Sequence, residues 1–253
     1  MKIDRVIFFT GTHAAFGALK QSQVDGFNAL LDAWEVMGSN DPRDLSYLLA
    51  TSWHETAATM QPIAEYGHGQ GHAYGRADPV THQTYFGRGD VELTWLPNYR
   101  KAGEKLGLDL VNHPELALRQ DVAAKIAIDG MTEGWFTGKK FSDYFNADKT
   151  DWAGARRIIN GTDRAAMIGG YGEKFYKIVT SAIVKDAAPV SIGANGASAT
   201  HAAPSKPAPA PQPAPLPQPA PSPMPSVSAT PVQPAPQSFW ARLLSALFHG
   251  VTQ

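Results

Sequence analysis

The chain lacks cysteine altogether and lacks a strong excess of either charge. With no cysteine in 253 residues, disulfide frameworks and thiolate-bound zinc sites are excluded, and the fold must be held together by packing. The formal net charge of −1 is far from the basic excess of a typical nucleic-acid-binding protein, so we expect no nucleic-acid partner. The hydrophobic fraction of 43% is sufficient for one sizeable core with appendages.

The amino-terminal segment lacks the unbroken apolar run of a signal peptide. In MKIDRVIFFTGTHAAFGAL, Asp4 precedes the apolar stretch, and Thr10, Thr12 and His13 interrupt it. This broken pattern favours a first helix that packs on the domain, with a cleaved signal as the alternative.

The composition changes sharply near residue 187. Residues 187–238 contain 15 of the 20 prolines, a single charged residue, Lys206, and no aromatic residue. Proline at this density cannot form helix interiors or sheet ladders, and the segment cannot bury enough apolar surface to offset its ordering entropy. We therefore predict a disordered, polyproline-biased linker over 187–237.

The last segment, SFWARLLSALFHGVTQ, has apolar residues at helical spacing. Ser238 can begin a helix and Gly250 can end it, which predicts a short amphipathic helix within 238–253. About a dozen residues are too few for a bilayer span, which needs about 20. Its apolar face, within 239–251, therefore predicts contact with a membrane surface, with the protein's own body or with another copy.

Helical periods dominate residues 1–186, which we predict to be one globular domain. One helix begins with Asp41 as its cap and Pro42 at its first position, and apolar residues then follow the 3.6-residue period. The stretch from 66 to 95 is instead rich in glycine and tyrosine, with turn residues and short β-prone runs. The sequence thus predicts a mainly α domain with a small irregular or β lobe.

Two glutamates in this domain are candidates for acid–base chemistry. Glu55 lies at the end of the Asp41 helix beside apolar residues, and Glu65 follows Pro62, where the chain has left that helix. Apolar surroundings favour a protonated carboxyl group, the form that a general acid requires. The glycines after Glu65 could fold the loop back so that two carboxylates face each other. The alternatives are a solvated Glu65, and a Glu55 that is solvated or paired with Arg88.

Four histidines near these glutamates raise the question of a zinc hydrolase. His54-Glu55 resembles the start of H-E-x-x-H, but position 58 is alanine, so the second helical ligand is missing. His68 and His72 are four residues apart, but the glycines around them make a helix there improbable. We expect no metal and no other cofactor, and we expect His54 to support the cleft by hydrogen bonding.

The segment QTYFGRGDVELTWLPNY combines aromatic rings with hydrogen-bonding groups. Sugar recognition needs this mixture, because flat rings cover the C–H faces while polar groups bind hydroxyls and acetamides. The alternative is a hairpin turn packed by its own aromatic side chains. The candidate substrate contacts in this segment are Tyr85, Arg88, Glu92, Trp95 and Asn98.

Four motifs in order resemble the family 19 glycoside hydrolases, which comprise chitinases and related phage and bacterial endolysins. They are HET at 54–56, YFGRGDVELTWLPNY at 85–99, NHPEL at 112–116 and RIINGT at 157–162. The segments LKQSQVDGFNALLDAWEV and HETAATMQPIAEYG are especially similar to the phage-type endolysins. The resemblance covers residues 6–184 and implies a lysozyme-like, bilobed, mainly helical fold.

The resemblance also implies roles for individual residues. Glu55 would be the general acid, Glu65 the general base, and Thr94 a group that helps to hold the attacking water. Asn98 and Asn160 would contact the substrate. The implied reaction is hydrolysis, with inversion and without a metal, of β-1,4 bonds next to N-acetylglucosamine.

The chain departs from the family pattern at several points. Glu92 replaces the usual glutamine, which puts its sugar contact in doubt because an ionised carboxylate cannot donate a hydrogen bond. The INGG of chitinases reads INGT here. The cysteines and long loops of plant chitinases are missing, which fits the shorter endolysin form.

We therefore expect an endolysin-type enzyme that cuts peptidoglycan, with a chitinase as the first alternative. As an endolysin it would be made in the bacterial host cytoplasm without a clear signal peptide and would reach the cell wall after release. Proteins of other classes that remain open are a non-catalytic glycan-binding module and an injected, envelope-targeting protein.

Overall fold

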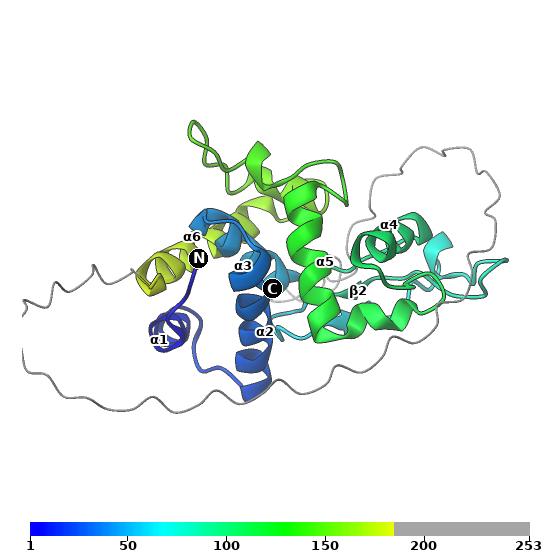
Figure 1. Cartoon of the computed structure of the whole chain (residues 1–253), viewed down its shortest axis with the longest axis horizontal. Coiled ribbons are helices and arrows are strands. Elements are labelled where there is room, and N and C mark those ends of the chain that lie inside the picture. Colours follow the sequence, from blue (N-terminus) through cyan, green and yellow to red (C-terminus); the bar gives the residue numbers. More distant parts are fainter. Residues whose placement is uncertain (185–253) are drawn as a thin grey trace, which may run out of the picture. The chain divides into compact units, whose positions relative to one another are not determined.

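The computed structural model describes residues 1–184, and this part of the chain is mainly helical (Figure 1). The predicted linker 187–237 and helix 238–253 lie outside the described residues. The described α-helices are α1 (Arg5–Phe16), α2 (Gln21–Met37), α3 (Pro42–Glu55), α4 (Leu96–Leu106), α5 (Gln120–Glu133) and α6 (Ala165–Ala182). Short 3₁₀ helices are η1 (Ala73–Gly75), η2 (Pro114–Leu118), η3 (Phe141–Asp143) and η4 (Gly154–Ile158). The strands are β1 (Ile63–Ala64) and β2 (Arg88–Gly89).

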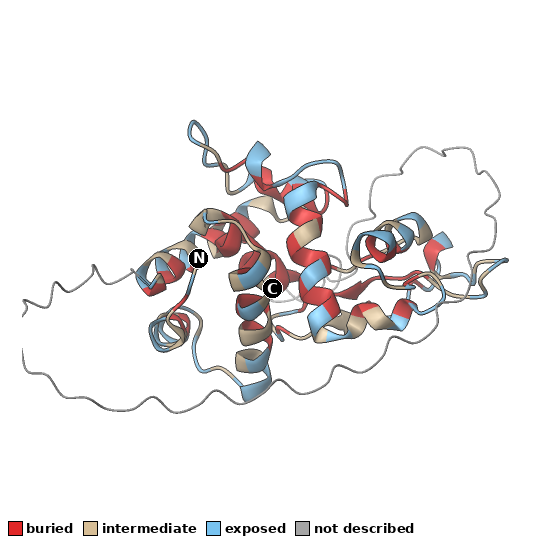
Figure 2. Cartoon of the chain, viewed as in Figure 1, coloured by how far each residue is buried: buried red, intermediate tan, exposed pale blue. Residues whose placement is uncertain are grey.

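Helix α3 is the most deeply buried element, and its start is specified by its sequence. The Asp41 side chain accepts a hydrogen bond from the Arg43 backbone N–H, and Pro42 occupies the first turn, as predicted. Residues 44–52 of the helix are all buried, as are His54 and Glu55 (Figure 2). A helix buried on every side holds its last residue, Glu55, in a fixed position inside the protein.

Helix α5 connects the helical body to a smaller lobe. It packs on α2 and α3 on one side and on α4 and β2 on the other, between the two groups of elements seen in Figure 1. In the lobe, β1 and β2 pair antiparallel, with Ile63 opposite Gly89 and Ala64 opposite Arg88. The predicted mainly α domain with a small β lobe is thereby confirmed for the described residues.

The two ends of the described domain are joined to each other. Ile3 and Ile183 form an antiparallel bridge, the Asp4 N–H donates to the Ala182 carbonyl at 2.7 Å, and the Val184 N–H donates to the Lys2 carbonyl at 2.9 Å. The predicted first helix is confirmed as α1, which packs against α6 and buries Phe8.

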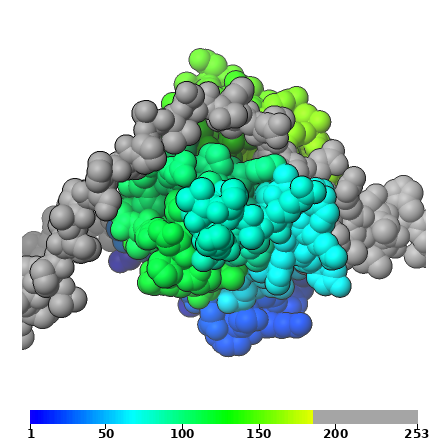
Figure 3. Space-filling view, turned by 90° about the vertical axis from the view of Figure 1, so that its right-hand side faces the viewer, coloured from blue at the N-terminus to red at the C-terminus, as the bar shows by residue number. Residues whose placement is uncertain are grey.

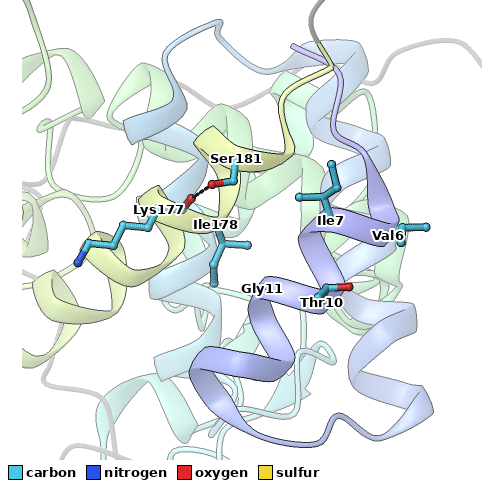
Figure 4. A pocket seen from close by; sticks show the side chains of 7 residues that line it. All are labelled: Val6, Ile7, Thr10, Gly11, Lys177, Ile178 and Ser181. Carbon is cyan, nitrogen blue, oxygen red and sulfur yellow. Dashed lines mark hydrogen bonds between the residues drawn. The ribbon is translucent and has the colours of Figure 1, made fainter.

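A groove lies between α1 and α6 (Figure 4). It is lined by Val6, Ile7, Thr10, Gly11, Lys177, Ile178 and Ser181. Val6 and Ile7 are exposed at its edge. Among the described helices, none is long and apolar enough to cross a lipid bilayer.

Candidate active site

Glu55 ends α3 and is almost completely buried, with 1% of its surface exposed. Its Oε1 accepts a hydrogen bond from Nη1 of Arg156 at 2.5 Å, and its Oε2 has no hydrogen-bond partner within residues 1–184. One carboxyl oxygen is therefore fixed by an ion pair, while the other is shielded from solvent and makes no hydrogen bond in the described structure.

Arg156 is a site residue that the sequence analysis missed. It comes from η4, is as buried as Glu55, and also directs Nε to the Asp163 carbonyl at 3.3 Å. The sequence analysis gave Arg88 as an alternative ion-pair partner of Glu55. That alternative was wrong, because Arg156, 101 positions away in the chain, binds Glu55 instead. The only sequence signal was the arginine doublet directly before the IIN motif.

Glu65 follows β1 and is held by neutral donors. The Tyr74 hydroxyl donates to its Oε1 at 2.9 Å, and the Gly87 N–H donates to its Oε2 at 3.1 Å. The backbone N–H of Glu65 in turn donates to the Gly87 carbonyl at 2.7 Å. Both oxygens of Glu65 therefore accept a hydrogen bond, which fixes the orientation of its carboxyl group.

A pocket opens at Glu65 on the lobe, whose face is seen in Figure 3 with residues of this segment in cyan. It is lined by Glu65, Tyr66, Gly67, Gly69, Gln70, Gly71 and His72. The glycine-rich loop thus folds back beside Glu65, as the sequence suggested.

Gly87 brings three of the predicted residues together. A Cβ atom placed on Gly87 would lie 3.2 Å from Cβ of Glu65, 3.1 Å from Cβ of Glu92 and 3.4 Å from Oγ1 of Thr94. Any side chain at position 87 would therefore push these groups apart. Thr94 is fixed next to Glu92, to whose carbonyl its hydroxyl donates at 2.7 Å. Asn98 caps the arrangement by donating Nδ2 to the Thr94 carbonyl at 2.8 Å.

Glu92 lies in the electric field of both other glutamates. Burial raises the pKa of its carboxyl group well above the usual value, the charges of Glu55 and Glu65 raise it further, and Arg156 opposes the increase. Glu92 as a whole is only partly buried, but its Oε1 is shielded from solvent and has no hydrogen-bond partner in the described structure. Three carboxyl groups and one guanidinium thus form a single electrostatic cluster.

His54, Trp95 and Asn160 surround this cluster. Burial lowers the pKa of His54, so the ring is neutral at pH 7, and its Nε2 finds no hydrogen-bond partner in the described part of the chain. The hydrogen-bonding support expected from His54 is thus not seen. Trp95 packs edge-on against Tyr74 with ring centroids 5.2 Å apart. The Asn160 N–H donates to the Arg156 carbonyl at 3.0 Å, which ties the IIN motif to the arginine.

Two predicted substrate contacts, Tyr85 and Arg88, are turned into the lobe. The Tyr85 hydroxyl donates to the Val111 carbonyl at 2.9 Å, and its ring is buried. Arg88 donates to the Thr84 carbonyl at 3.0 Å and to the Tyr99 hydroxyl at 2.9 Å. We correct both assignments: these side chains brace the loop, because their polar groups are already used inside the protein.

The histidines of the glycine-rich loop are used in ring stacking. His68 stacks on Phe86 with centroids 4.5 Å apart, and His72 stacks on Tyr74 at 5.0 Å. Within residues 1–184 no group of three or more histidine, aspartate or glutamate side chains is placed to hold a metal ion.

Part of the chain is similar to proteins of known family. Residues 38–143 match the model of the family described as chitinase class I, a glycoside hydrolase family 19 model. Chitinase 11 of Oryza sativa subsp. japonica is 36% identical over 86 residues, which are 32% of this chain and 32% of that protein. An acidic endochitinase of Dioscorea japonica is 38% identical over 78 residues, which are 30% of this chain and 29% of that protein. The chain thus spans about a third of the length of these curated relatives.

The fold is shared with a solved bacterial protein. The crystal structure of chitinase C from Streptomyces griseus matches with a TM-score of 0.51 and 20% identity, covering 70% of this chain and 76% of that one. At this identity the likeness concerns the fold, and it supports the lysozyme-like, mainly helical architecture. The matched segment contains HET, YFGRGDVELTWLPNY and NHPEL, and it includes Glu55, Glu65 and Glu92. Residues 38–143 of this chain are thus similar to the family 19 glycoside hydrolases, the chitinase class I family.

Proposed function

We propose that this chain hydrolyses β-1,4 bonds in glycans that contain N-acetylglucosamine, with Glu55 as general acid and Glu65 as general base. One observation carries the proposal. Two buried carboxyl groups from separate elements, Glu55 of α3 and Glu65 after β1, lie close enough to Glu92 for both to raise its pKa. Buried carboxyl groups are rare unless they are paired or used in function.

The reaction follows from the hydrogen bonds of the two glutamates. Glu55 donates a proton from Oε2 to the oxygen of the leaving sugar, and Arg156 stabilises the negative charge that remains. A water molecule attacks the anomeric carbon from the opposite face as the glycosidic bond breaks. Glu65, with Thr94 beside it, takes the proton of that water. Because water attacks directly, the anomeric configuration is inverted.

We infer that peptidoglycan is the substrate. The support is the similarity of QSQVDG and HETAATMQPIAEYG to the phage-type endolysins, together with the contact between these two segments. Gln23 donates Nε2 to the Ala58 carbonyl at 2.7 Å, and Gln61 donates Nε2 to the Ser22 carbonyl at 2.5 Å. The two segments thus form one structural unit. Such an enzyme would act on the cell wall after release from the host cytoplasm, with residues 239–251 as its candidate contact with a membrane surface.

Chitin is the second candidate substrate. It is favoured by the names of the relatives, which include several endochitinases. Both polymers carry N-acetylated sugars in β-1,4 linkage, so the same acid and base can serve either one.

The first test replaces each glutamate while preserving its shape. We expect Glu55→Gln and Glu65→Gln each to lower kcat by about 10²–10⁴-fold, because an amide can neither donate nor accept the transferred proton. The matched control is Glu104→Gln, on the exposed side of α4, which should leave the rate unchanged. Wild-type turnover by Glu55→Gln would overturn the acid assignment.

The substrate is decided with purified peptidoglycan and colloidal chitin in parallel. Mass spectrometry of the products identifies the polymer and the bond that is cut, and NMR of the fresh product reports the anomer. Release of sugars from chitin alone would overturn the peptidoglycan assignment. A product that keeps the anomeric configuration would overturn the direct attack by water.

A further inference from the structure

Glu92 occupies the position where the family pattern has glutamine. An amide offers both a donor and an acceptor, whereas an ionised carboxylate offers only acceptors. A neutral carboxyl group restores the pair, with one O–H donor and one carbonyl acceptor. The protonation state of Glu92 therefore decides whether it can perform the hydrogen bonding of an amide.

The backbone holds Glu92 firmly in the site. Its φ of +51° lies in the left-handed region, which non-glycine residues adopt rarely. Arg88 and Leu93 exchange backbone hydrogen bonds of 3.1 and 2.8 Å across this turn, and Thr94 binds the Glu92 carbonyl. The side chain leaves the turn next to Gly87, between Glu65 and Thr94. Its first side-chain carbon is thus placed beside Glu65 and Thr94.

The charged groups that face Glu92 come from three separate elements: Glu55 from α3, Glu65 from the segment after β1, and Arg156 from η4. Arg156 is engaged with Glu55, to whose Oε1 it donates from Nη1. Among the described residues, Glu65 accepts hydrogen bonds from the neutral Tyr74 hydroxyl and Gly87 N–H, and no cation forms an ion pair with it. A negative charge on Glu92 would therefore be a second negative charge without an ion pair among the described residues of this cluster.

The surroundings of the Glu92 oxygens lead to the same conclusion. Its Oε1 is shielded from solvent and accepts no hydrogen bond within the described residues. An ionised oxygen that is shielded from solvent and has no donor is costly, whereas a protonated carboxyl group carries no net charge to solvate. Burial and the two neighbouring carboxylates raise the pKa of Glu92 in agreement with this geometry.

We propose that Glu92 works as a neutral carboxylic acid, and that its O–H donates a hydrogen bond to an uncharged acceptor oxygen of the bound glycan. The identity of the ligand rests on the proposed function, whereas the neutral state of Glu92 does not. When Glu92 ionises at high pH, the donor is lost and a negative charge is added beside Glu65. The wild-type enzyme then loses substrate binding on the alkaline side.

The test compares Glu92→Gln with Glu92→Met over a range of pH. Glutamine keeps a donor and cannot ionise, so Glu92→Gln should retain kcat/KM near the wild-type value at mildly acid pH and keep it where the wild type declines. Methionine has a similar volume and no donor, and it should raise KM by about tenfold at every pH. The inference is overturned if the pH profile of Glu92→Gln has the same alkaline decline as the wild type, or if Glu92→Met matches Glu92→Gln.

A second measurement needs no substrate. In protein labelled with ¹³C at the glutamate carboxyl groups, the signal lost in Glu92→Gln belongs to Glu92. We expect it to remain protonated at a pH where the signal of exposed Glu104, identified by Glu104→Gln, has become ionised. If Glu92 ionised over the same pH range as Glu104, the inference would be overturned. If neither polymer is cut but Glu92 stays protonated, the proposed function fails while the neutral state of Glu92 stands.

Discussion

Arg156 and Arg157 are adjacent residues in opposite environments. Arg156 is fully buried against Glu55, whereas Arg157 is exposed. Because removal of one partner from a buried ion pair leaves the other charge without compensation, the two arginines should respond very differently to the same substitution.

We expect Arg156→Met to lower the free energy of unfolding by about 3–5 kcal/mol at neutral pH, the usual cost of breaking a buried pair. Arg157→Met serves as the control and should change stability by less than about 0.5 kcal/mol, as is usual for surface positions. Denaturant unfolding measures both variants. The double variant Arg156→Met with Glu55→Gln should recover part of the loss, and a fully additive loss would contradict the direct pairing.

The sequence singled out Glu55 and Glu65 as candidates, but it did not indicate Arg156, the partner of Glu55. Glu55 stood out because it ended an apolar helix, and Glu65 because it preceded a run of glycines. Arg156 had no such local signal, since its role depends on a fold that brings η4 to the end of α3. Arg88 was the partner that the sequence suggested, but the carbonyl groups of its own loop already bind its guanidinium.

At the scale of elements, the turn after α3 determines the path of the chain from Glu55 to Glu65. Ala57, Ala58 and Met60 all have positive φ, at 50°, 63° and 55°. The turn packs against α2, where the Met60 carbonyl lies directly against Gly26. A Cβ atom on Gly26 would be only 1.7 Å from the Met60 carbonyl oxygen. Gly26 is thus required for close approach between α2 and the turn.

We therefore expect Gly26→Ala to lower the free energy of unfolding by about 1–3 kcal/mol, as overpacking typically does, and to reduce activity as the turn moves. The control is Gly170→Ala in α6, where an added Cβ meets nothing within 4 Å. This second variant should be stabilised by up to about 1 kcal/mol, because alanine is the better helix former. Thermal unfolding of the pair provides the comparison, and equal shifts would contradict the role of Gly26.

The elements differed in how far the sequence specified them. Asp41 and Pro42 marked the beginning of α3 because capping chemistry is local. The turn at 57–60 carried no signal, since alanine and methionine rarely adopt positive φ and do so here because of contacts with α2. The strands β1 and β2 have two residues each, too few for any periodicity.

At the scale of the whole domain, buried acids make stability depend on pH. Burial raises the pKa of Asp90 to about 7 and that of Asp44 to about 6. In the unfolded chain both groups ionise near pH 4. Between these values the folded state binds more protons than the unfolded state, so the free energy of unfolding must fall as the pH rises from about 4 to about 7.

Asp90→Asn should remove much of this dependence, because asparagine has no proton to lose. We expect the variant to exceed the wild type in free energy of unfolding by on the order of 1–4 kcal/mol at pH 8, with the difference shrinking toward pH 4. Denaturant unfolding at a series of pH values tests this, with exposed Asp148→Asn as the control. If the difference in free energy of unfolding grew as the pH fell, the predicted direction of the pH dependence would be wrong.

The bridge between Ile3 and Ile183 has a consequence for the order of the chain. Because the first and last residues of the described domain exchange backbone hydrogen bonds, a few added residues would suffice to join them covalently. New ends could then be opened at an exposed turn such as the one at Gly138, and the glutamate cluster would be assembled from the same segments in a permuted order.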